Sequence, residues 1–289
     1  MNIVVTGATG QLGRLVIADL LARGVPAEGI TAIVRDAGKG ADLAALGVRP
    51  HVADYDRPET FDGAFAAGDR VLLISGSEPG RRGPQHKAVI DAAAAAGVAQ
   101  FAYTGVFGGP NAWIALAADH HVTEEAILSS GLPHTFLRNN WYSEMYTGDL
   151  AGIVARGAVA NAIGPDGLVA TAPRKDFAAA AAAVLTGDGH LGKAYELSGD
   201  RAWAFGEFAA EVSRQTGKPV AHVTLPPAEL KAVLVGAGLP DALADIFVEI
   251  DDAINKGLLA ATPGDLSTLI GRPTTPIAET IATDLAKLG

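Results

Sequence analysis

Three glycines near the amino terminus constrain this chain more than any other feature of its sequence. Gly7, Gly10 and Gly13 lie in the stretch TGATGQLG, directly after the apolar run 2–6 and directly before the amphipathic segment 11–23. A strand, a glycine turn and a helix in this order bring the first helix amides to the end of the strand, where they can bind a pyrophosphate. The motif by itself is also compatible with a plain strand-to-helix turn.

Short β-branched apolar runs alternate with longer helix-like segments through the first half of the chain. The runs cover residues 3–5, 30–34, 71–75, 101–104 and 134–137, and the helical segments cover residues 12–23, 59–67, 84–96 and 116–130. Such alternation predicts a parallel sheet with crossover helices on both faces, and strands that are covered on both faces are almost wholly apolar. We therefore predict an α/β fold, a Rossmann-type doubly wound parallel sheet.

The second half of the chain has a different residue pattern, and we expect it to form a smaller, mainly helical lobe. Glycine-rich turns occur around residues 148–167, and the chain from Trp203 onward is mostly helix-like. The run 194–197 is typical of a strand that returns to the main sheet. We predict a dinucleotide-binding domain of residues 1–139 with about 193–199, and a smaller lobe of about 140–192 and 200–289.

The composition excludes several classes of protein. Cysteine is absent, which rules out disulfides, cysteine nucleophiles and thiolate metal sites. The formal net charge of −10 argues against a nucleic-acid partner, because neutralising phosphates needs clustered lysine and arginine. We see neither a secretory signal nor an apolar stretch long enough to span a bilayer. We expect a cytoplasmic protein that acts on small molecules, as a monomer or a homodimer.

The residue after the second strand indicates which dinucleotide is bound. NAD-selective sites place a carboxylate there for the ribose hydroxyl, whereas this chain has Arg35. A guanidinium suits a 2′-phosphate, so the sequence predicts NADPH, with NADH as a weaker cofactor. The following Asp36, and the alternative that Arg35 is a solvated loop residue, leave this choice open.

Two further strand ends contribute candidate cofactor-binding residues. Asp54 and Tyr55 follow a third strand, expected between the runs 30–34 and 71–75, and are expected to border the adenine. The segment 75–77 follows the fourth strand and is expected to line the ribose and pyrophosphate. Both lie at carboxyl ends of parallel strands, which is where ligands of open α/β sheets bind.

One catalytic pair common in this fold is missing. Many such dehydrogenases and epimerases use a tyrosine with a lysine four residues later, but none of the five tyrosines here has that partner. This argues against a sugar epimerase or an alcohol dehydrogenase of that design. Either the protein does no chemistry, or it reduces an acceptor that takes a hydride without strong acid catalysis.

Several stretches together resemble the NmrA-like branch of the atypical short-chain dehydrogenases. They are TGATGQLG, AIVRD, VADYD, LLISGSEPGRRGPQH, AYTG, LPHTFLRNNWYSEMY and YELSGDRAWAF, and the resemblance continues to LIGRPTTPIAE near the end. SEPGRRGPQH and RNNWYSE resemble in particular the flavin-free NADPH-dependent quinone reductases, with triphenylmethane reductases as close relatives.

The resemblance implies a role for individual residues. The phosphate loop would be Gly7, Ala8, Thr9, Gly10, Gln11 and Leu12, the 2′-phosphate would meet Arg35, and the ribose and nicotinamide would meet Ser75, Gly76 and Ser77. The segment Asn139, Asn140, Trp141, Tyr142 and Ser143 would meet the nicotinamide and the substrate mouth. Asn140 replaces a glycine of the relatives, which would narrow the pocket.

A quinone acceptor accounts for the missing pair. Quinones are electron-poor, and hydride addition gives a stabilised quinolate, so catalysis would come largely from positioning two bound reactants. Trp141, Tyr142 and Tyr146 could stack on a planar ring, with Tyr142 as a catalytic residue. The alternative is that these aromatic side chains form a core where the lobes meet.

The proton for the reduced acceptor would come from solvent or from His120, which lies where related reductases place a catalytic lysine. A histidine there could donate a proton near neutral pH, or it could simply pack against the helix. The pairs His120–Glu124 and His121–Glu125 have i,i+4 spacing but no evident third ligand, so we predict a solvated helix face and no metal site. Arg81 and Arg82 would belong to a flexible loop, either a lid or an ordinary solvated loop.

Two rival functions remain open at this point. Some NmrA-like proteins bind dinucleotides and regulate partner proteins without turnover. Alternatively, the chain could reduce another activated acceptor, such as a triphenylmethane dye.

Overall fold

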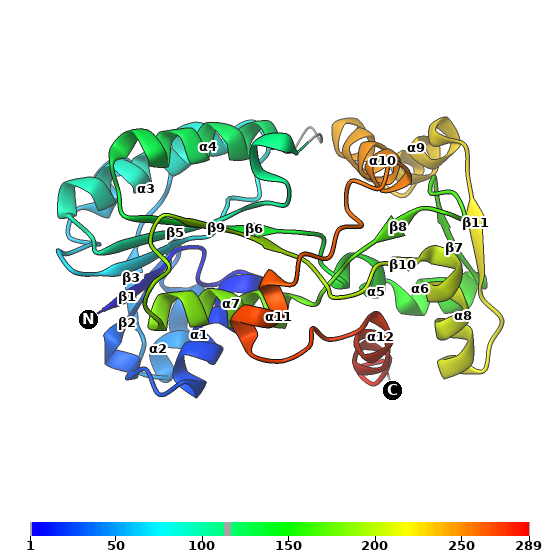
Figure 1. The fold of residues 1–289 in the computed structure, drawn as a ribbon, viewed down its shortest axis with the longest axis horizontal. Helices are drawn as coiled ribbons and strands as arrows, with labels where there is room; N and C mark the ends of the chain where they lie inside the picture. The colour runs from blue at the N-terminus through cyan, green and yellow to red at the C-terminus, as the bar shows by residue number, and fades with distance from the viewer. Residues whose placement is uncertain (1, 113–116, 289) are drawn as a thin grey trace.

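A seven-stranded parallel sheet forms one half of the molecule (Figure 1). The computed structural model describes residues 2–112 and 117–288. The strand order is β3-β2-β1-β4-β5-β6-β9, so the order reverses between β1 and β4 and leaves a crevice at the carboxyl ends of these two strands. The strands are β1 (Ile3–Val5), β2 (Ile30–Val34), β3 (Arg49–Val52), β4 (Arg70–Leu73), β5 (Gln100–Val106), β6 (His134–Asn139) and β9 (Lys193–Leu197). The predicted Rossmann-type fold is confirmed, and so is the return of the last strand beside β6.

Helices cover both faces of the sheet, as Figure 1 shows. One face carries α3 (Arg82–Ala96) and α4 (Ala117–Ser130), and the other carries α1 (Gln11–Ala22), α2 (Ala41–Ala45), α7 (Arg174–Thr186) and α11 (Asp265–Ile270). The predicted start of α4 at Leu116 lies outside the described residues. Single 3-10 turns occur at Ala27–Gly29, Gly38–Gly40, Pro58–Phe61 and Gly109–Asn111. The prediction of a helix over 59–67 is wrong. Only the 3-10 turn Pro58–Phe61 forms there, and Gly63 adopts a positive φ that ends helical structure.

Alternate side chains of β1 build the two cores on either side of the sheet. Ile3 and Val5 pack against α1 and α7, whereas Val4 packs on the opposite side with residues of α3 and β5. All three side chains are fully buried. Each such burial contributes about 1.5–3 kcal/mol, which explains why the strand is apolar at every position.

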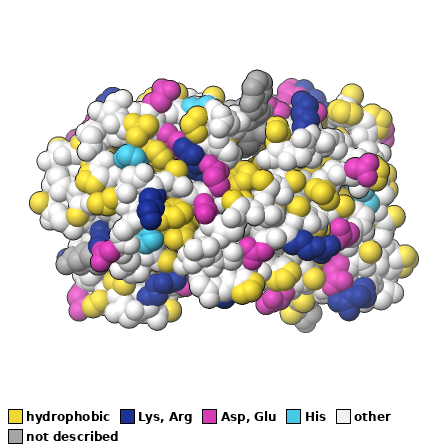
Figure 2. Space-filling view, viewed as in Figure 1, with side chains coloured by type: hydrophobic (Ala, Val, Ile, Leu, Met, Phe, Trp, Pro, Cys, Tyr) yellow, Lys and Arg dark blue, Asp and Glu magenta, His cyan; other side chains and the backbone are white. Residues whose placement is uncertain are grey.

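The smaller lobe is mainly helical. Its helices are α5 (Glu144–Thr147), α6 (Leu150–Arg156), α8 (Phe205–Thr216), α9 (Pro227–Gly236), α10 (Asp241–Asn255) and α12 (Ile277–Leu285). Two small sheets pair β8 (Leu168–Val169) with β10 (Trp203–Ala204), and β7 (Ala158–Asn161) with β11 (Ala221–Thr224). Its core centres on Trp203, Phe205 and Phe208. Acidic and basic side chains are interspersed over the face drawn in Figure 2, so the acidic excess is not gathered there in one patch.

Helix α7 belongs to the sheet layer, although the sequence-based division places it in the smaller lobe. It packs against α1, and Ala178, Ala181 and Ala182 are buried in the core beneath the sheet. Alanine side chains let two helices approach closely, a contact between segments some 160 residues apart that local patterns do not reveal. The domain bounds themselves stay a prediction. In the described part of the chain, no helix combines the length and apolar character that crossing a membrane requires.

We expect Gly13→Ala to destabilise the protein by about 1–3 kcal/mol, the usual cost of overpacking. A Cβ at this position would lie 2.8 Å from the Cα of Ala8 and still closer to the carbonyl oxygen of Gly7, both of them backbone atoms that cannot yield without moving the turn. The measurement is the free energy of unfolding in urea.

Gly206→Ala is the matched control, because a Cβ on this glycine of α8 meets nothing within 4 Å. It should leave stability unchanged or raise it by up to about 1 kcal/mol, through helix propensity. Equal effects of the two substitutions would contradict the close approach of α1 to the glycine turn.

Candidate functional site

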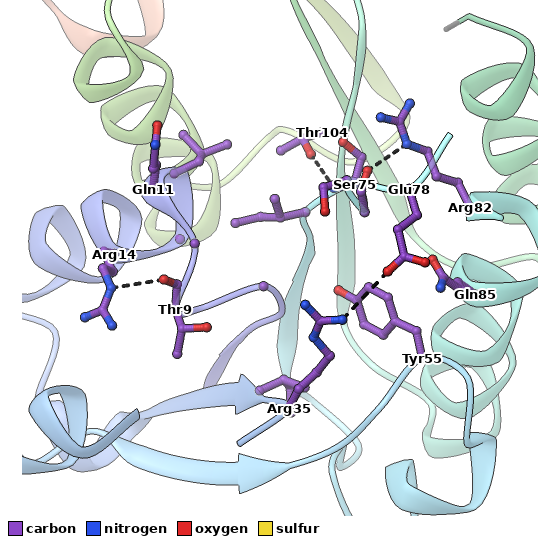
Figure 3. A pocket seen from close by; sticks show the side chains of 18 of the residues that line it. Thr9, Gln11, Arg14, Arg35, Tyr55, Ser75, Glu78, Arg82, Gln85 and Thr104 are labelled. Atoms are coloured by element: carbon purple, nitrogen blue, oxygen red, sulfur yellow. Dashed lines mark hydrogen bonds and ion pairs between the residues drawn. The ribbon is translucent and has the colours of Figure 1, made fainter. Parts of the chain in front are cut away.

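A cavity of about 720 Å³ opens at the crevice between β1 and β4 (Figure 3). Its lining comes from the glycine turn, the ends of β2, β3 and β4, and the start of α3. Tyr142 and Arg174, which follow β6 in the chain, complete it. A cavity of this size and place is typical of a cofactor site in an open α/β sheet.

Most of the predicted cofactor residues lie in the lining. These are Gly7, Thr9, Gly10, Gln11, Leu12, Arg35, Asp54, Tyr55, Ser75, Gly76 and Ser77, together with the predicted catalytic Tyr142. The lining also includes Gly13 of the motif and Arg82, which the sequence singled out without a cofactor role, and it includes residues that sequence reasoning missed: Arg14, Ile33, Lys39, Ala53, Ile74, Glu78, Gln85, Thr104 and Arg174. Many of these are chain neighbours of predicted residues, so reading further along each strand end would have found them.

The start of α1 presents free amides to this cavity. The amide of Gly10 donates to the carbonyl of Gly7 at 2.9 Å, which closes the turn, and Gly7 has a φ of +57° that favours glycine. No side chain among the described residues caps the helix. The first helix amides therefore remain available to an anion, and the helix dipole favours one there.

Three basic side chains surround the end of β2. Arg35 is 71% exposed and lies 3.8 Å from Glu78, an ion pair too exposed to hold it in place. Arg14 donates to the carbonyl of Thr9 at 3.0 Å and to that of Lys39 at 3.1 Å, so it is anchored beside the other two cations. Arg14 is also paired with Asp42, so three basic and two acidic side chains meet at this corner of the cavity.

Tyr55 supplies a buried polar group to the same wall. Its hydroxyl forms no hydrogen bond with any described residue, although the atom is buried. Burial raises the pKa of Tyr55 to about 12, so it is a neutral phenol at pH 7. A buried hydroxyl without a partner is uncommon, and a bound ligand that hydrogen-bonds to it would satisfy it.

Comparison with protein families bears on what occupies this cavity. Residues 7–188 match the model of the NAD(P)H-binding family, a span that includes every strand of the main sheet except β1 and β9. The chain belongs to the NAD(P)H-binding family. NAD(P)H as the cofactor is therefore confirmed, and the glycine motif at the start of the matched span stays the predicted site of its phosphates.

Individual relatives match over almost the whole chain. The chain is 45% identical to quinone oxidoreductase 2 of Escherichia coli (strain K12) over 280 residues, which cover 97% of each protein. The crystal structure of an E. coli NADPH-dependent quinone oxidoreductase complexed with NADPH superposes with a TM-score of 0.93 at 44% identity, covering 97% of this chain and 99% of that one. Triphenylmethane reductase of Citrobacter sp., complexed with NADP(H), gives a TM-score of 0.91 at 41% identity and covers 98% and 100%. The resemblance stated from the sequence is confirmed.

The segment from Asn139 to Tyr146 mostly faces away from the cavity. The Asn140 amide donates to the carbonyls of Ala170 and Leu259, at 3.1 and 3.0 Å, and its oxygen accepts the Trp141 amide. It therefore joins two parts of the smaller lobe, and its side chain does not narrow the cavity. Asn140 and Trp141 do not line the cavity; nor do Ala8 and Asn139.

Of the predicted substrate residues, only Tyr142 reaches the cavity. The Ser143 hydroxyl is buried against Thr171 at 2.9 Å, and the Tyr146 ring packs edge-on against Trp203. These side chains stabilise the smaller lobe, which is the aromatic-core alternative for Tyr146. Trp141 also packs against the core of that lobe.

Tyr142 is held by two neighbours. Its hydroxyl oxygen accepts a hydrogen bond from the Asn139 amide at 3.1 Å, and the Arg174 guanidinium lies over its ring at 4.5 Å. Burial raises the pKa of Tyr142. The cavity wall next to the smaller lobe therefore consists of a fixed aromatic ring with a cation on it.

The surroundings of His120 argue against its predicted role as a proton donor. Arg82 donates to its Nε2 at 3.3 Å, and its Nδ1 lies 2.7 Å from the Tyr103 hydroxyl, within the protein and outside the cavity lining. Burial and the Arg82 charge lower the pKa of His120 to about 3, so it carries no donatable extra proton at pH 7.

Two further expectations about this region are wrong. Arg82 is not in a solvated loop: it begins α3, is buried, and donates to the Gly76 carbonyl at 2.7 Å. Glu124 is not on a solvated face either, because it forms a buried ion pair with Arg138 at 2.8 Å. Among the described residues, no group of three potential ligands could hold a metal ion.

We expect His120 to make the protein less stable in acid. An unfolded histidine binds a proton below about pH 6.5, whereas folded His120 does so only near pH 3. Between these values the unfolded state binds more protons, so the free energy of unfolding falls as the pH falls. The contribution reaches about 3 kcal/mol at pH 4.5 and is measured by urea unfolding at pH 7 and pH 4.5.

His120→Gln should remove most of this contribution and flatten the pH dependence by a comparable amount. His134→Gln controls for the loss of an imidazole as such. If wild type and His120→Gln lose the same stability between the two pH values, the buried neutral state of His120 is wrong.

Proposed function

We propose that this chain is an NADPH-dependent reductase that transfers a hydride directly to a quinone-like acceptor, without flavin. The observation that carries the proposal is the 45% identity to quinone oxidoreductase 2 across 97% of both proteins. The cavity supports it, because its lining combines a pyrophosphate-binding turn, a cationic 2′-phosphate corner and an aromatic wall.

Each part of the cofactor has candidate partners in the lining. The amides that follow Gly10 bind the pyrophosphate, and Arg35, Lys39 and Arg14 bind the 2′-phosphate. Asp54 and Tyr55 border the adenine, and Ser75, Gly76, Ser77 and Thr104 form the wall for the nicotinamide riboside. NADH lacks the 2′-phosphate and is the weaker cofactor.

Bound NADPH supplies the hydride, and the residues of the chain supply orientation and charge. Arg174 covers one face of the Tyr142 ring and also pairs with Glu144, so its guanidinium is the group that places a positive charge where the reduced acceptor becomes an anion, and Tyr142 supports it from behind. Hydride addition leaves a quinolate, which takes its proton from solvent and not from His120. A reaction with the hydride from NADPH and the proton from solvent needs no tyrosine–lysine pair, because an electron-poor acceptor requires positioning more than acid catalysis.

The sequence left two alternatives open, a regulatory role without turnover and a different hydride acceptor. A purely regulatory dinucleotide-binding role is not favoured, because the full-length relatives are named as reductases. A triphenylmethane dye is the less favoured acceptor, because identity to that reductase is 41% against 45% to quinone oxidoreductase 2. The cytoplasmic location and the monomer or homodimer predicted above are part of this proposal and rest on the sequence.

We expect the purified protein, freed of flavin, to oxidise NADPH when 1,4-benzoquinone is added. The measurement is the fall of the nicotinamide absorbance, corrected for the reaction without protein. A triphenylmethane dye under the same conditions ranks the two acceptor classes. If NADPH binds and its absorbance never falls with any acceptor, the chain is a binding protein and the proposal fails.

We expect Arg35→Ala to weaken NADPH binding roughly 10- to 100-fold, the value of one or two charge-assisted hydrogen bonds, and to change NADH binding less than about twofold. Dissociation constants for both cofactors are compared by nicotinamide fluorescence. Arg156→Ala, an exposed arginine of α6 outside the cavity lining, is the matched control and should change neither. Equal losses for NADPH and NADH would mean that Arg35 does not contact the 2′-phosphate.

A further inference from the structure

The backbone that follows β4 is held from behind by side chains. The amide of Ile74 donates to the Thr6 hydroxyl at 3.0 Å, and the amide of Ser75 donates to the Thr104 hydroxyl at 2.9 Å. Thr6 follows β1 and Thr104 belongs to β5, so both neighbours of β4 contribute one acceptor. Figure 3 shows the Ser75 contact at the cavity wall.

The next residue, Gly76, is fixed on both sides of its backbone by α3. Its amide donates to Nε2 of His86 at 2.9 Å, and its carbonyl accepts from Nε of Arg82 at 2.7 Å. A Cβ on Gly76 would lie 3.4 Å from the Gln85 amide oxygen and 3.7 Å from the His86 ring, so the backbone already rests on α3. Because Gly76 itself lines the cavity, these contacts set the shape of that wall.

The partners of His86 define its protonation state. The Gly76 amide can only donate, so Nε2 must be the acceptor. Nδ1 lies 2.9 Å from the Thr123 hydroxyl, which gives its own proton to the Asp119 carbonyl at 2.7 Å. Nδ1 therefore carries the single ring proton, and an imidazolium would turn a second N–H toward the amide of Gly76.

The surroundings of His86 favour this neutral form. The ring is fully buried. The charged groups that face it are Arg82 on its own helix and Asp119 on α4, and the neutral rings of Tyr103 and Tyr55 pack edge-on against it. Burial and the Arg82 charge outweigh Asp119 and lower the pKa of His86 to about 4.

We propose that neutral His86 is a positioning residue for the cofactor. Because it accepts a hydrogen bond from the Gly76 amide, it holds the wall of residues 75–77 in the shape that receives the nicotinamide riboside. This inference rests on the proposed function, since it assigns that wall to NADPH. His86 lies behind the wall and outside the lining, so it acts through the lining residues that it contacts: it hydrogen-bonds to Gly76 and packs against the Tyr55 ring. Protonation of the ring removes the acceptor and loosens the wall.

The test compares two replacements of His86 at pH 7.5. His86→Leu fills similar space without an acceptor and leaves a buried amide unsatisfied, so the dissociation constant and the KM for NADPH should rise about tenfold while kcat changes less than about threefold. His86→Gln can place an amide oxygen near the position of Nε2, so it should keep both values within about threefold of wild type. His190→Gln, a histidine beside Tyr195 and outside the lining, is the matched control.

A pH series separates positioning from general support of the fold. NADP⁺ is the probe, because it withstands acid. Its affinity for wild type should begin to fall below about pH 5 and be about halved by pH 4, relative to its affinity for His86→Gln, which has no ring to protonate. The ratio of the two proteins removes the titration of the 2′-phosphate itself, and circular dichroism confirms that both remain folded at each pH.

Two results would overturn the inference. One is a folded His86→Leu protein that binds NADPH within twofold of wild type, and the other is an identical acid dependence in wild type and His86→Gln. If His86→Leu does not fold, Thr123→Val takes its place, because it removes the hydroxyl that fixes the His86 tautomer. It should weaken NADPH binding about threefold, and an unchanged affinity would also overturn the inference. NADPH binding can be measured without a quinone. A protein that shows the expected binding pattern but never reduces a quinone would therefore contradict the proposed function and leave the role of His86 intact.

Discussion

The close approach of α1 to the turn after β1 is the constraint on which the rest of this structure depends. Gly13 has no side chain at the point where the helix meets the carbonyl of Gly7. That contact aims the first helix amides into the crevice between β1 and β4. The other face of α1 is held by the alanines of α7, so the position of the anion site is determined by small side chains on both sides of one helix.

Charge is distributed so that an acidic protein can bind a polyanion. The formal net charge is −10, yet Arg14, Arg35 and Lys39 share one corner of the cavity. A fourth cation, Arg82, lines another wall of the cavity, is largely buried, and accounts in part for the low pKa of both His86 and His120. Two neutral imidazoles can then accept hydrogen bonds in a place where charged ones would repel the arginine.

The sequence predicts best what depends on neighbouring residues. The strand–turn–helix unit, the alternation of strands and helices, and the residues at strand ends such as Arg35 and Ser75 were all found in this way, because parallel strands bring their carboxyl ends to one edge. Arg174 and the packing of α7 were missed, since they depend on contacts between distant segments. Asn140 was assigned to the site because its segment resembles that of a family, and only the fold shows that its side chain binds two buried carbonyls instead.

The crevice itself creates the need for the side chains behind it. β4 ends at Leu73 while its neighbour β5 continues to Val106, so the amides of residues 74–76 leave the sheet without strand partners. Buried amides must be satisfied, and a continued strand would close the crevice. Thr6, Thr104 and His86 replace the missing carbonyls with side-chain acceptors, which lets the backbone turn away from β1 and remain fixed. Two of these acceptors are hydroxyls that do not titrate near neutral pH, and the third is an imidazole. Along residues 74–76, a fall in pH would therefore remove a hydrogen-bond acceptor at His86 only.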